Sequence, residues 1–289
     1  MNVVREITPL TQSDCFTIFS KYNPEFDLPL HNHEEIELNL ILNAAGAKRS
    51  VGDHSGIIED FELVMAGSNL SHRWARHHCS SNDTREITIQ FHKDLLDERL
   101  LKKNELSGIR KLLDNIKKGV LFSQQTAREI TPRIIELSKN NGFSAILELF
   151  SIIHTLADAP DKQLLSSADT NLEKLNSNSR RIEKVFEYMN LNFSKQLTLT
   201  EASKIANMPE ASFSRFIKTR TGYTFTDSLT EIRLAHVIRM LIDTPYSVAE
   251  IAFKCGFNNM ANFNRIFKSK KGCTPKEFRA DYNGNMIFV

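Results

Sequence analysis

Hydrophobic residues near the end of the chain recur at helical spacing and then stop at a glycine. Val248, Ile251 and Ala252 share one face of a helix. Gly256 stands where that helix should end, because glycine readily takes the left-handed conformation of a helix cap. The pattern predicts a short helix followed directly by a tight turn.

A second helix is predicted after this turn. Asn258 and Asn259 offer N-cap side chains, and Phe263, Ile266 and Phe267 then fall on one side of the helix. The opposite side is polar, and such a helix fits the major groove of DNA. An ordinary pair of surface helices in a bundle is the alternative interpretation of this stretch alone.

An internal repeat favours the first interpretation. Phe213–Gly222 matches Phe263–Gly272 at an offset of 50 residues, and Leu199–Met208 parallels Val248–Phe257 at an offset of 49. The second turn therefore holds one extra residue. The joining segment Thr226–Ile242 has its own helical apolar pattern, so we expect two helix-turn-helix motifs connected by one helix.

The order of residues in the repeat resembles that of the AraC-type bacterial transcription regulators. The matching residues are Phe213, Arg215, Lys218, Gly222, Arg233, Leu234, Ile251, Ala252, Gly256, Phe257, Phe263, Arg265, Phe267, Lys268, Gly272, Pro275, Phe278 and Arg279. The resemblance covers about 100 residues, with departures at Ser203, Pro209 and Phe278. It implies double-stranded DNA and RNA polymerase as partners, and a homodimer.

The outer faces of the two second helices supply the candidate DNA contacts. The predicted DNA-binding residues are Ala211, Ser214, Arg215, Lys218, Met260, Asn262, Asn264, Arg265 and Lys268. Arg215 and Arg265 are equivalent in the repeat, and an arginine can donate two hydrogen bonds to one guanine. We expect Lys218 and Lys268 to meet phosphates, which position the protein without specifying sequence.

The first third of the chain has the pattern of short strands. Phe16–Phe19, Ile36–Leu42, Phe61–Met65 and Ile87–Phe91 are separated by turn residues, and apolar and polar residues alternate in the last of them. Many short strands at this spacing indicate a sandwich or a barrel.

Within these strands, His31 to Glu37 resembles the first cupin motif, HxHxxxE, and Gly67 to His72 resembles a remnant of the second. The resemblance implies that His31, His33, Glu37 and His72 occupy the positions of metal ligands. Imidazole and carboxylate can hold a divalent metal. The second motif is incomplete, however, and AraC-type cupins usually keep a degraded form. We therefore predict no bound metal, no cofactor and no catalytic residue.

A barrel of this size can hold one small ligand. The predicted effector-binding residues are His31, His33, Glu37, Arg49, His72 and Trp74. An aromatic face beside polar groups suits a sugar, which is our first choice of effector. Arg49 as a surface charge and Trp74 as a core residue are the alternatives.

The middle of the chain is predicted to be helical from about Lys93 to Ala157. These helices cover the barrel or pair with a second copy. Residues 159–178 are rich in Ser, Asn and Asp, which is typical of a linker. The predicted domains are 1–158, with strands to 92 and helices from 93, and 179–289 for DNA binding. The fold class is α+β, with a cupin-like barrel, a helical subdomain and an all-α domain.

Charge separates the two predicted domains, although the whole chain carries only +2. Residues 179–289 contain 17 Lys and Arg against 10 Asp and Glu, a net charge of +7, whereas residues 1–178 carry −5. A basic domain beside an acidic one is expected when only the first meets phosphate.

The remaining features favour a cytoplasmic protein. The four cysteines have no CxxC spacing, which indicates free thiols, and neither a signal peptide nor a membrane-length apolar run is visible. We predict a transcription regulator controlled by a small-molecule effector, and not an enzyme. The alternative is a metal-dependent cupin enzyme with a DNA-binding appendage.

Overall fold

The computed structural model describes residues 3–6, 8, 10, 14–26, 29–140, 142–167, 172–281 and 286–288. The chain divides into two compact units. The barrel unit comprises Met1–Glu6, Ser13–Asn171 and Gly284–Val289, and the helical unit comprises Ile7–Gln12 and Leu172–Asn283. The predicted α+β class, with a strand-rich first part and a helical last part, is confirmed.

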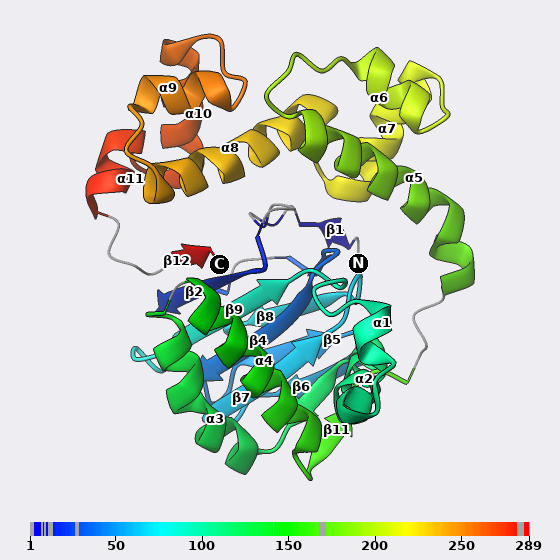
Figure 1. Ribbon diagram of the computed structural model, residues 1–289, viewed down its shortest axis with the longest axis vertical. Helices are drawn as coiled ribbons and strands as arrows, with labels where there is room; N and C mark the ends of the chain where they lie inside the picture. The colour runs from blue at the N-terminus through cyan, green and yellow to red at the C-terminus, as the bar shows by residue number, and fades with distance from the viewer. Residues whose placement is uncertain are drawn as a thin grey trace. The chain divides into compact units, whose positions relative to one another are not determined.

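Two sheets form the barrel unit (Figure 1). The smaller sheet has the order β1 (Val4–Arg5), β3 (His31–Asn32), β8 (His72–Ala75), β5 (Lys48–Val51) and β6 (His54–Ile57). The larger sheet has the order β11 (Lys162–Leu164), β10 (Val120–Phe122), β7 (Phe61–Ala66), β4 (Ile36–Leu42), β9 (Arg85–Phe91), β2 (Phe16–Tyr22) and β12 (Met286–Phe288). Of the described pairs, only β1 with β3 is parallel.

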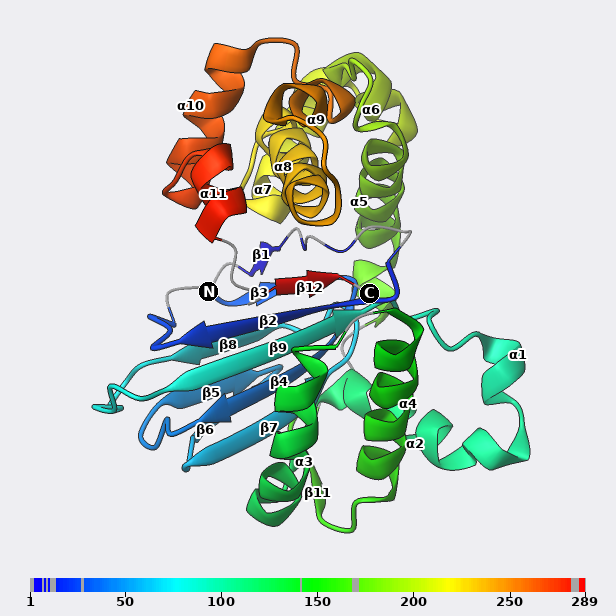
Figure 2. The same cartoon turned by 60° about the vertical axis from the view of Figure 1, so that its left-hand side comes forward.

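The larger sheet is apolar on its outer face, and helices cover that face (Figure 2). Leu38 and Leu40 of β4 alternate with polar neighbours, and so do Ile87 and Ile89 of β9, so that each strand turns its apolar set outward. The covering helices are α2 (Ser107–Asn115), α3 (Gln124–Leu137) and α4 (Gly142–Asp158), which follow the short α1 (Glu98–Leu101). One continuous core joins the helices to the sheet.

The inner face of the larger sheet, called the polar face below, looks toward the smaller sheet. Arg49 of β5 donates through Nη1 to Glu62 of β7 at 2.6 Å, so side chains of the two sheets meet between them. A second apolar cluster, with Val51 and Trp74 from the smaller sheet and Val64 from the larger, fills another part of this space. The interior of the barrel unit is therefore part apolar and part polar.

Two strands lie where the sequence predicts other structure. Residues 120–122 interrupt the predicted helices as β10, and residues 162–164 of the predicted linker form β11 beside it. Val120 and Phe122 are buried against β7, a pairing that sequence periodicity cannot show. The prediction of a linker over 159–178 is also wrong at its end, because α5 begins at Leu172.

The last strand of the chain corrects the predicted C-terminal bound of the second domain. Residues 286–288, which we predicted to belong to the DNA-binding domain, form β12 and pair with β2 in the barrel unit. Their pairing is antiparallel and extends the larger sheet by one strand.

The helical unit consists of seven helices within the described residues (Figure 1). They are α5 (Leu172–Asn192), α6 (Leu199–Ile205), α7 (Glu210–Thr221), α8 (Phe225–Asp243), α9 (Val248–Lys254), α10 (Met260–Lys271) and α11 (Pro275–Asp281). The joining helix is one residue longer at each end than predicted. Among the described residues, no helix is both long and apolar enough to cross a bilayer.

The repeat seen in the sequence is also a repeat of helix starts. Thr198 caps α6 and Ser247 caps α9, each in a reciprocal pair with a glutamate three residues later. Thr224 caps α8 with Asp227 in the same way. Equivalent positions of the two halves therefore begin their helices by the same local hydrogen bonds.

Candidate nucleic-acid interface and buried polar site

The first helix-turn-helix, α6 and α7, turns through Asn207, whose φ is +51°. Asparagine tolerates this left-handed conformation better than most residues. Helix α7 then starts after Pro209, which makes no side-chain cap. Glu210, the first residue of α7, accepts a hydrogen bond from Thr200 at 2.7 Å, which ties the two helices together.

The second helix-turn-helix, α9 and α10, turns through Gly256 at a φ of +82°. A β-carbon here would lie 2.7 Å from the carbonyl oxygen of Phe193, so glycine is required for space as well as for conformation. Asn259 caps α10 by accepting from the backbone N–H of Asn262 at 2.9 Å. The predicted cap and the predicted extra turn residue are both present.

The inner faces of α7 and α10 are buried as expected. Phe213 and Ile217 lie in the core of the first half, and Phe263 and Phe267 are fully buried in the second. Of the nine predicted DNA-binding residues, eight are exposed and Met260 is half-buried. The structure thus places these residues on two free helix surfaces, and their contacts with DNA stay a prediction.

The two equivalent arginines differ in their surroundings. Arg265 donates through Nη2 to the side-chain oxygen of Asn262 at 2.9 Å, one helical turn away. Arg215 makes no side-chain hydrogen bond or ion pair within the described part of the chain. The guanidinium of Arg265 is therefore held in place before any ligand binds, an arrangement that sequence spacing alone did not indicate.

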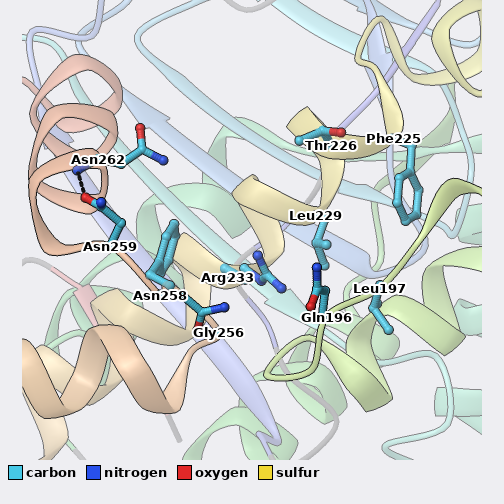
Figure 3. Close-up of a pocket in the computed structure, with 11 residues that line it drawn as sticks. Gln196, Leu197, Phe225, Thr226, Leu229, Arg233, Gly256, Asn258, Asn259 and Asn262 are labelled. Atoms are coloured by element: carbon cyan, nitrogen blue, oxygen red, sulfur yellow. Dashed lines mark hydrogen bonds between the residues drawn. The ribbon is translucent and has the colours of Figure 1, made fainter.

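A groove of about 320 Å³ separates the two halves beside α8 (Figure 3). Leu197 and Leu229 line one side, and Gly256 and Asn258 line the other. Arg233 of α8 crosses the floor and donates to the carbonyl oxygens of Phe193 and Lys195, both at 2.8 Å. This arginine fixes the loop before the first helix-turn-helix to the joining helix.

Lys270 is occupied by an intramolecular partner. Its ammonium lies 2.7 Å from the carboxylate of Glu231 on α8, and this hydrogen bond raises the pKa of the lysine. A contact between Lys270 and a phosphate would have to compete with that ion pair. Lys218 and Lys268 are exposed.

In the barrel unit the structure brings four predicted residues together. Glu37 of β4 is surrounded by three histidines, and all four side chains are buried. His31 lies in β3, His33 follows the end of that strand, and His72 begins β8. The Nε2 atoms of His33 and His72 lie 3.0 and 3.5 Å from the Glu37 carboxylate. The rings of His31 and His72 are 4.4 Å apart at their centroids.

The charge states in this cluster follow from burial and contact. Burial lowers the pKa of His31 to about 4, and the neighbouring His72 adds to the effect. Burial alone would also lower the pKa of His33, but the hydrogen bond and charge of Glu37 raise it to about 9. Burial opposes ionisation of Glu37, yet His72 and His33 hold the pKa of this carboxyl well below its ordinary value.

Polar residues that we did not predict complete the site. Gln90 donates to Glu37 at 3.0 Å, Asn39 donates to Glu86 at 3.1 Å, and the carboxylate of Glu6 lies 3.5 Å from Nε2 of His31. The signal was available: β4 and β9 place polar residues at every second position, which puts them on one face. Sequence reasoning used only the apolar half of that alternation.

The remaining predicted residues, Arg49 and Trp74, lie elsewhere on the inside. Arg49 is buried and paired with Glu62, which contradicts a surface role, and Trp74 is buried against His72 with ring centroids 5.6 Å apart. Burial raises the pKa of Glu62, although the positive charge of Arg49 acts to lower it. All six predicted effector residues therefore line the interior of the barrel unit.

The comparisons with known proteins agree with the repeat. The helix-turn-helix domain family matches residues 202–281. The chain is 24% identical over 270 residues to the HTH-type transcriptional activator RhaR of Mannheimia succiniciproducens, covering 90% of each chain. It is 30% identical to the activator RhaS of the same organism over 95 residues, which are 33% of this chain and 35% of that one.

Solved structures include a similar chain over nearly the full length. The crystal structure of ToxT from Vibrio cholerae O395 matches with a TM-score of 0.49 and 15% identity, covering 93% of this chain and 99% of the other. A transcriptional regulator from Chromobacterium violaceum, described as having an AraC-type DNA-binding domain, matches 36% of this chain and 95% of its own, with 23% identity and a TM-score of 0.34.

Proposed function

We propose, on the premise that this chain is a DNA-binding transcription regulator of the AraC type, that α7 and α10 read two segments of one duplex and that a small polar molecule in the barrel unit controls them. One observation carries the first part. The two helices repeat in sequence and both end at a glycine in the left-handed conformation, Gly222 and Gly272, and each exposes an arginine at the same position of an amphipathic helix.

A selection from randomised duplexes with the full-length chain tests this proposal. We expect two blocks of preferred bases separated by a constant spacer. The double variant Arg215→Ala/Arg265→Ala should lose the preference within both blocks, because arginine pairs with guanine in the major groove. A selection that enriches no sequence at low salt would exclude specific DNA recognition by these helices.

Lys268→Ala provides the contrasting variant. A phosphate contact contributes to all sequences alike, so this variant should weaken binding uniformly and reduce the salt slope by about one. A sequence-selective loss of binding would instead assign Lys268 to a base.

The effector site is the polar face between the two sheets. Gln90 Oε1, Asn39 Oδ1 and Thr17 Oγ1 are buried there without a hydrogen-bond partner among the described residues. Buried polar atoms are normally satisfied, so an additional hydrogen-bonding molecule is expected beside them. A hydroxyl-rich ligand such as a sugar offers donors and acceptors in the required number, and Trp74 offers an aromatic surface close by.

Thermal-shift measurements on the full-length chain test the effector class. A sugar that binds should raise the melting temperature, and organic acids should not, because the site already contains the buried carboxyl groups of Glu37 and Glu62 and the half-buried one of Glu86. Gln90→Ala should abolish the rise, and Gln163→Ala, at an exposed position of β11, should retain it. A rise that survives Gln90→Ala would place the ligand elsewhere.

The proposal extends to partners and location. A regulator of this type acts on DNA in the cytoplasm, contacts RNA polymerase, binds as a homodimer and catalyses no reaction. The four cysteines are free, in agreement with the sequence-based prediction.

A further inference from the structure

Polar contacts connect the two helix-turn-helix halves to each other around α8. The guanidinium of Arg233 donates to the carbonyl oxygens of Phe193 and Lys195, which both lie in the loop before α6. The same guanidinium faces the turn of the second half, because a β-carbon at Gly256 would lie 2.9 Å from its Nε atom. Arg233 therefore contacts both halves where the groove separates them (Figure 3).

The backbones of the two halves also approach each other at this point. The carbonyl oxygen of Phe193 would lie only 2.7 Å from a β-carbon at Gly256, so the loop of the first half packs directly on the turn of the second. The ring of Phe257 lies nearby, with its centroid 5.9 Å from Cζ of Arg233. A guanidinium presents its donors in a rigid planar fork, so its two hydrogen bonds define an orientation as well as a distance.

A second contact between the halves involves Lys270, near the end of α10. Its ammonium lies 2.7 Å from the carboxylate of Glu231 and 5.5 Å from the ring centroid of Tyr223. Tyr223 lies between α7 and α8, and Glu231 precedes Ile232, which belongs to the core of the first half. Residues two apart in a helix point about 200° away from each other, so Glu231 and Arg233 project from nearly opposite sides of α8.

Contacts on opposite sides of α8 restrict a motion that apolar packing restricts weakly. Both halves pack on this helix through apolar side chains, and the hydrophobic effect is non-directional. Hydrogen bonds depend strongly on direction. The polar contacts therefore resist rotation of one half about the helix, whereas the helix itself sets the distance between the halves.

We propose that Arg233 and the Glu231–Lys270 pair are positioning residues that fix the rotation of α10 relative to α7, and so determine the number of base pairs between the two recognised blocks. This inference rests on the proposed function, and it concerns side chains that act through the reading helices. One additional base pair rotates a block by about 35° around the duplex. A rigid reader then loses the binding of one half, because both halves can no longer engage together.

A library in which the two selected blocks are separated by spacers of different lengths tests the proposal. We expect the full-length chain to prefer one length, and Arg233→Met to reduce this preference by about 5-fold or more, with unchanged base preferences within each block. Arg233→Lys should behave in the same way, because an ammonium lacks the planar fork. An unchanged spacer preference in folded Arg233→Met would overturn the proposal.

Glu231→Gln and Lys270→Met test the second contact. Each should reduce the spacer preference, and the double variant should reduce it no further than either single variant, which a double-mutant cycle measures. A phosphate contact of Lys270 predicts a different pattern. Lys270→Met would then weaken binding at every spacer length and reduce the salt slope by about one, and Glu231→Gln would strengthen binding. That pattern would overturn the proposal.

Lys254→Met is the matched control. The ammonium of Lys254 lies 4.8 Å from the ring centroid of Tyr246, and both residues belong to the second half. This variant loses the same kind of contact and the same charge as Lys270→Met, and it should keep the spacer preference. If circular dichroism shows Arg233→Met to be unfolded, Glu231→Gln takes its place with the same expectation.

Distances between spin labels on α7 and α10 separate this inference from the proposed function. Thr219 and Ser269 are exposed and equivalent in the repeat, so Thr219→Cys and Ser269→Cys can carry the labels. Cys15 and Cys273 are changed to serine, since the other two cysteines are buried. Without DNA, we expect a narrow distance distribution that becomes broader with Arg233→Met.

The two measurements fail independently. Equal distance distributions with and without Arg233→Met would overturn the positioning role, even in a chain that binds DNA specifically. A broader distribution in a chain that selects no duplex would instead confirm the positioning contacts and exclude the proposed DNA recognition.

Discussion

The two helix-turn-helix halves share a scaffold but differ at the helix that faces outward. The first half turns through Asn207, begins α7 without a side-chain cap and places the acidic Glu210 at its start. The second half turns through Gly256, caps α10 with Asn259 and holds Arg265 by a hydrogen bond from its guanidinium to Asn262. Helix α7 carries three basic residues and one acidic residue, whereas α10 carries four basic residues and no acidic one.

On the proposed function, this difference indicates that the two helix-turn-helix halves contribute unequally to DNA binding. Both halves begin their first helix, α6 or α9, with the same capping box, and both bury an equivalent phenylalanine of the second helix, Phe213 or Phe263, so the scaffold itself does not distinguish them. The second half has more positive charge and a guanidinium that is already oriented, which reduces the entropy lost on binding. We therefore expect the second half to contribute more affinity and more sequence discrimination than the first.

The largest expected effect is on folding, at the two turns. Gly256→Ala should destabilise the helical unit by about 2–4 kcal/mol, because it adds left-handed strain to a collision with the carbonyl of Phe193. Asn207→Ala, at the equivalent position, should cost only about 1 kcal/mol. Urea unfolding followed by circular dichroism measures both values.

Tryptophan fluorescence is the control for this pair, because Trp74 is the only tryptophan and lies in the barrel unit. The unfolding transition reported by Trp74 should not shift in either variant. Equal losses in the two variants would show that the two turns are under the same constraint, contrary to the comparison.

The next effect concerns the arginines singly. Arg265→Ala should reduce affinity for the selected duplex by about 1–3 kcal/mol and relax preference at one position. Arg215→Ala should do the same at another position with a smaller loss, since its guanidinium is not held in advance. Fluorescence anisotropy at fixed salt compares them. A larger loss for Arg215→Ala would reverse the assigned roles.

Asn262 should act through Arg265. Asn262→Ala should weaken specific binding by about 0.5–1.5 kcal/mol, the usual contribution of one hydrogen bond, and relax the same base preference as Arg265→Ala. It should have no further effect when Arg265 is already alanine, which a double-mutant cycle measures. Ser212→Ala, at the equivalent position of α7, is the matched control. Additive losses would mean that Asn262 contacts DNA directly.

The smallest effect is on pH dependence, and it affects the first half only. His236 of α8 stacks on Phe193 with ring centroids 3.6 Å apart, and burial lowers its pKa to about 4. In the unfolded chain the imidazole of His236 is protonated below about pH 6.5. The free energy of unfolding should therefore fall as the pH drops from 6.5 to 4, by about 1–2 kcal/mol after allowance for partial exposure.

His236→Phe keeps the aromatic stacking and removes the titrating group. The free energy of unfolding of this variant should therefore depend less on pH between 4 and 6.5. Urea unfolding at several pH values measures the difference between the variant and the unsubstituted chain. Identical slopes would show that another group controls the acid sensitivity of the helical unit.

The sequence predicted the helical unit better than the barrel unit, for a physical reason. The caps, glycines and apolar faces of α6 to α10 are local signals, and Gly256 and Asn259 behave as their residue types suggest. Strands β10 and β11 depend on partners far along the chain, and no local pattern reveals them. The four cupin-like residues were found by motif, but Gln90 and Asn39 belong to the site only through sheet register.

Helix α8, with 19 residues, belongs to both halves. Phe225, Leu229 and Ile232 are buried in the core of the first half, and Val237 and Leu241 are buried nearer the other end of the helix. The distance and rotation between the two reading helices are therefore built into a stiff rod. A base substitution within one block of the DNA site can be compensated by a change of side chain on the helix that contacts it. Inserting or deleting a base pair between the blocks instead rotates one block away from its helix. Promoters recognised by this protein should accordingly tolerate substitutions and preserve their spacing.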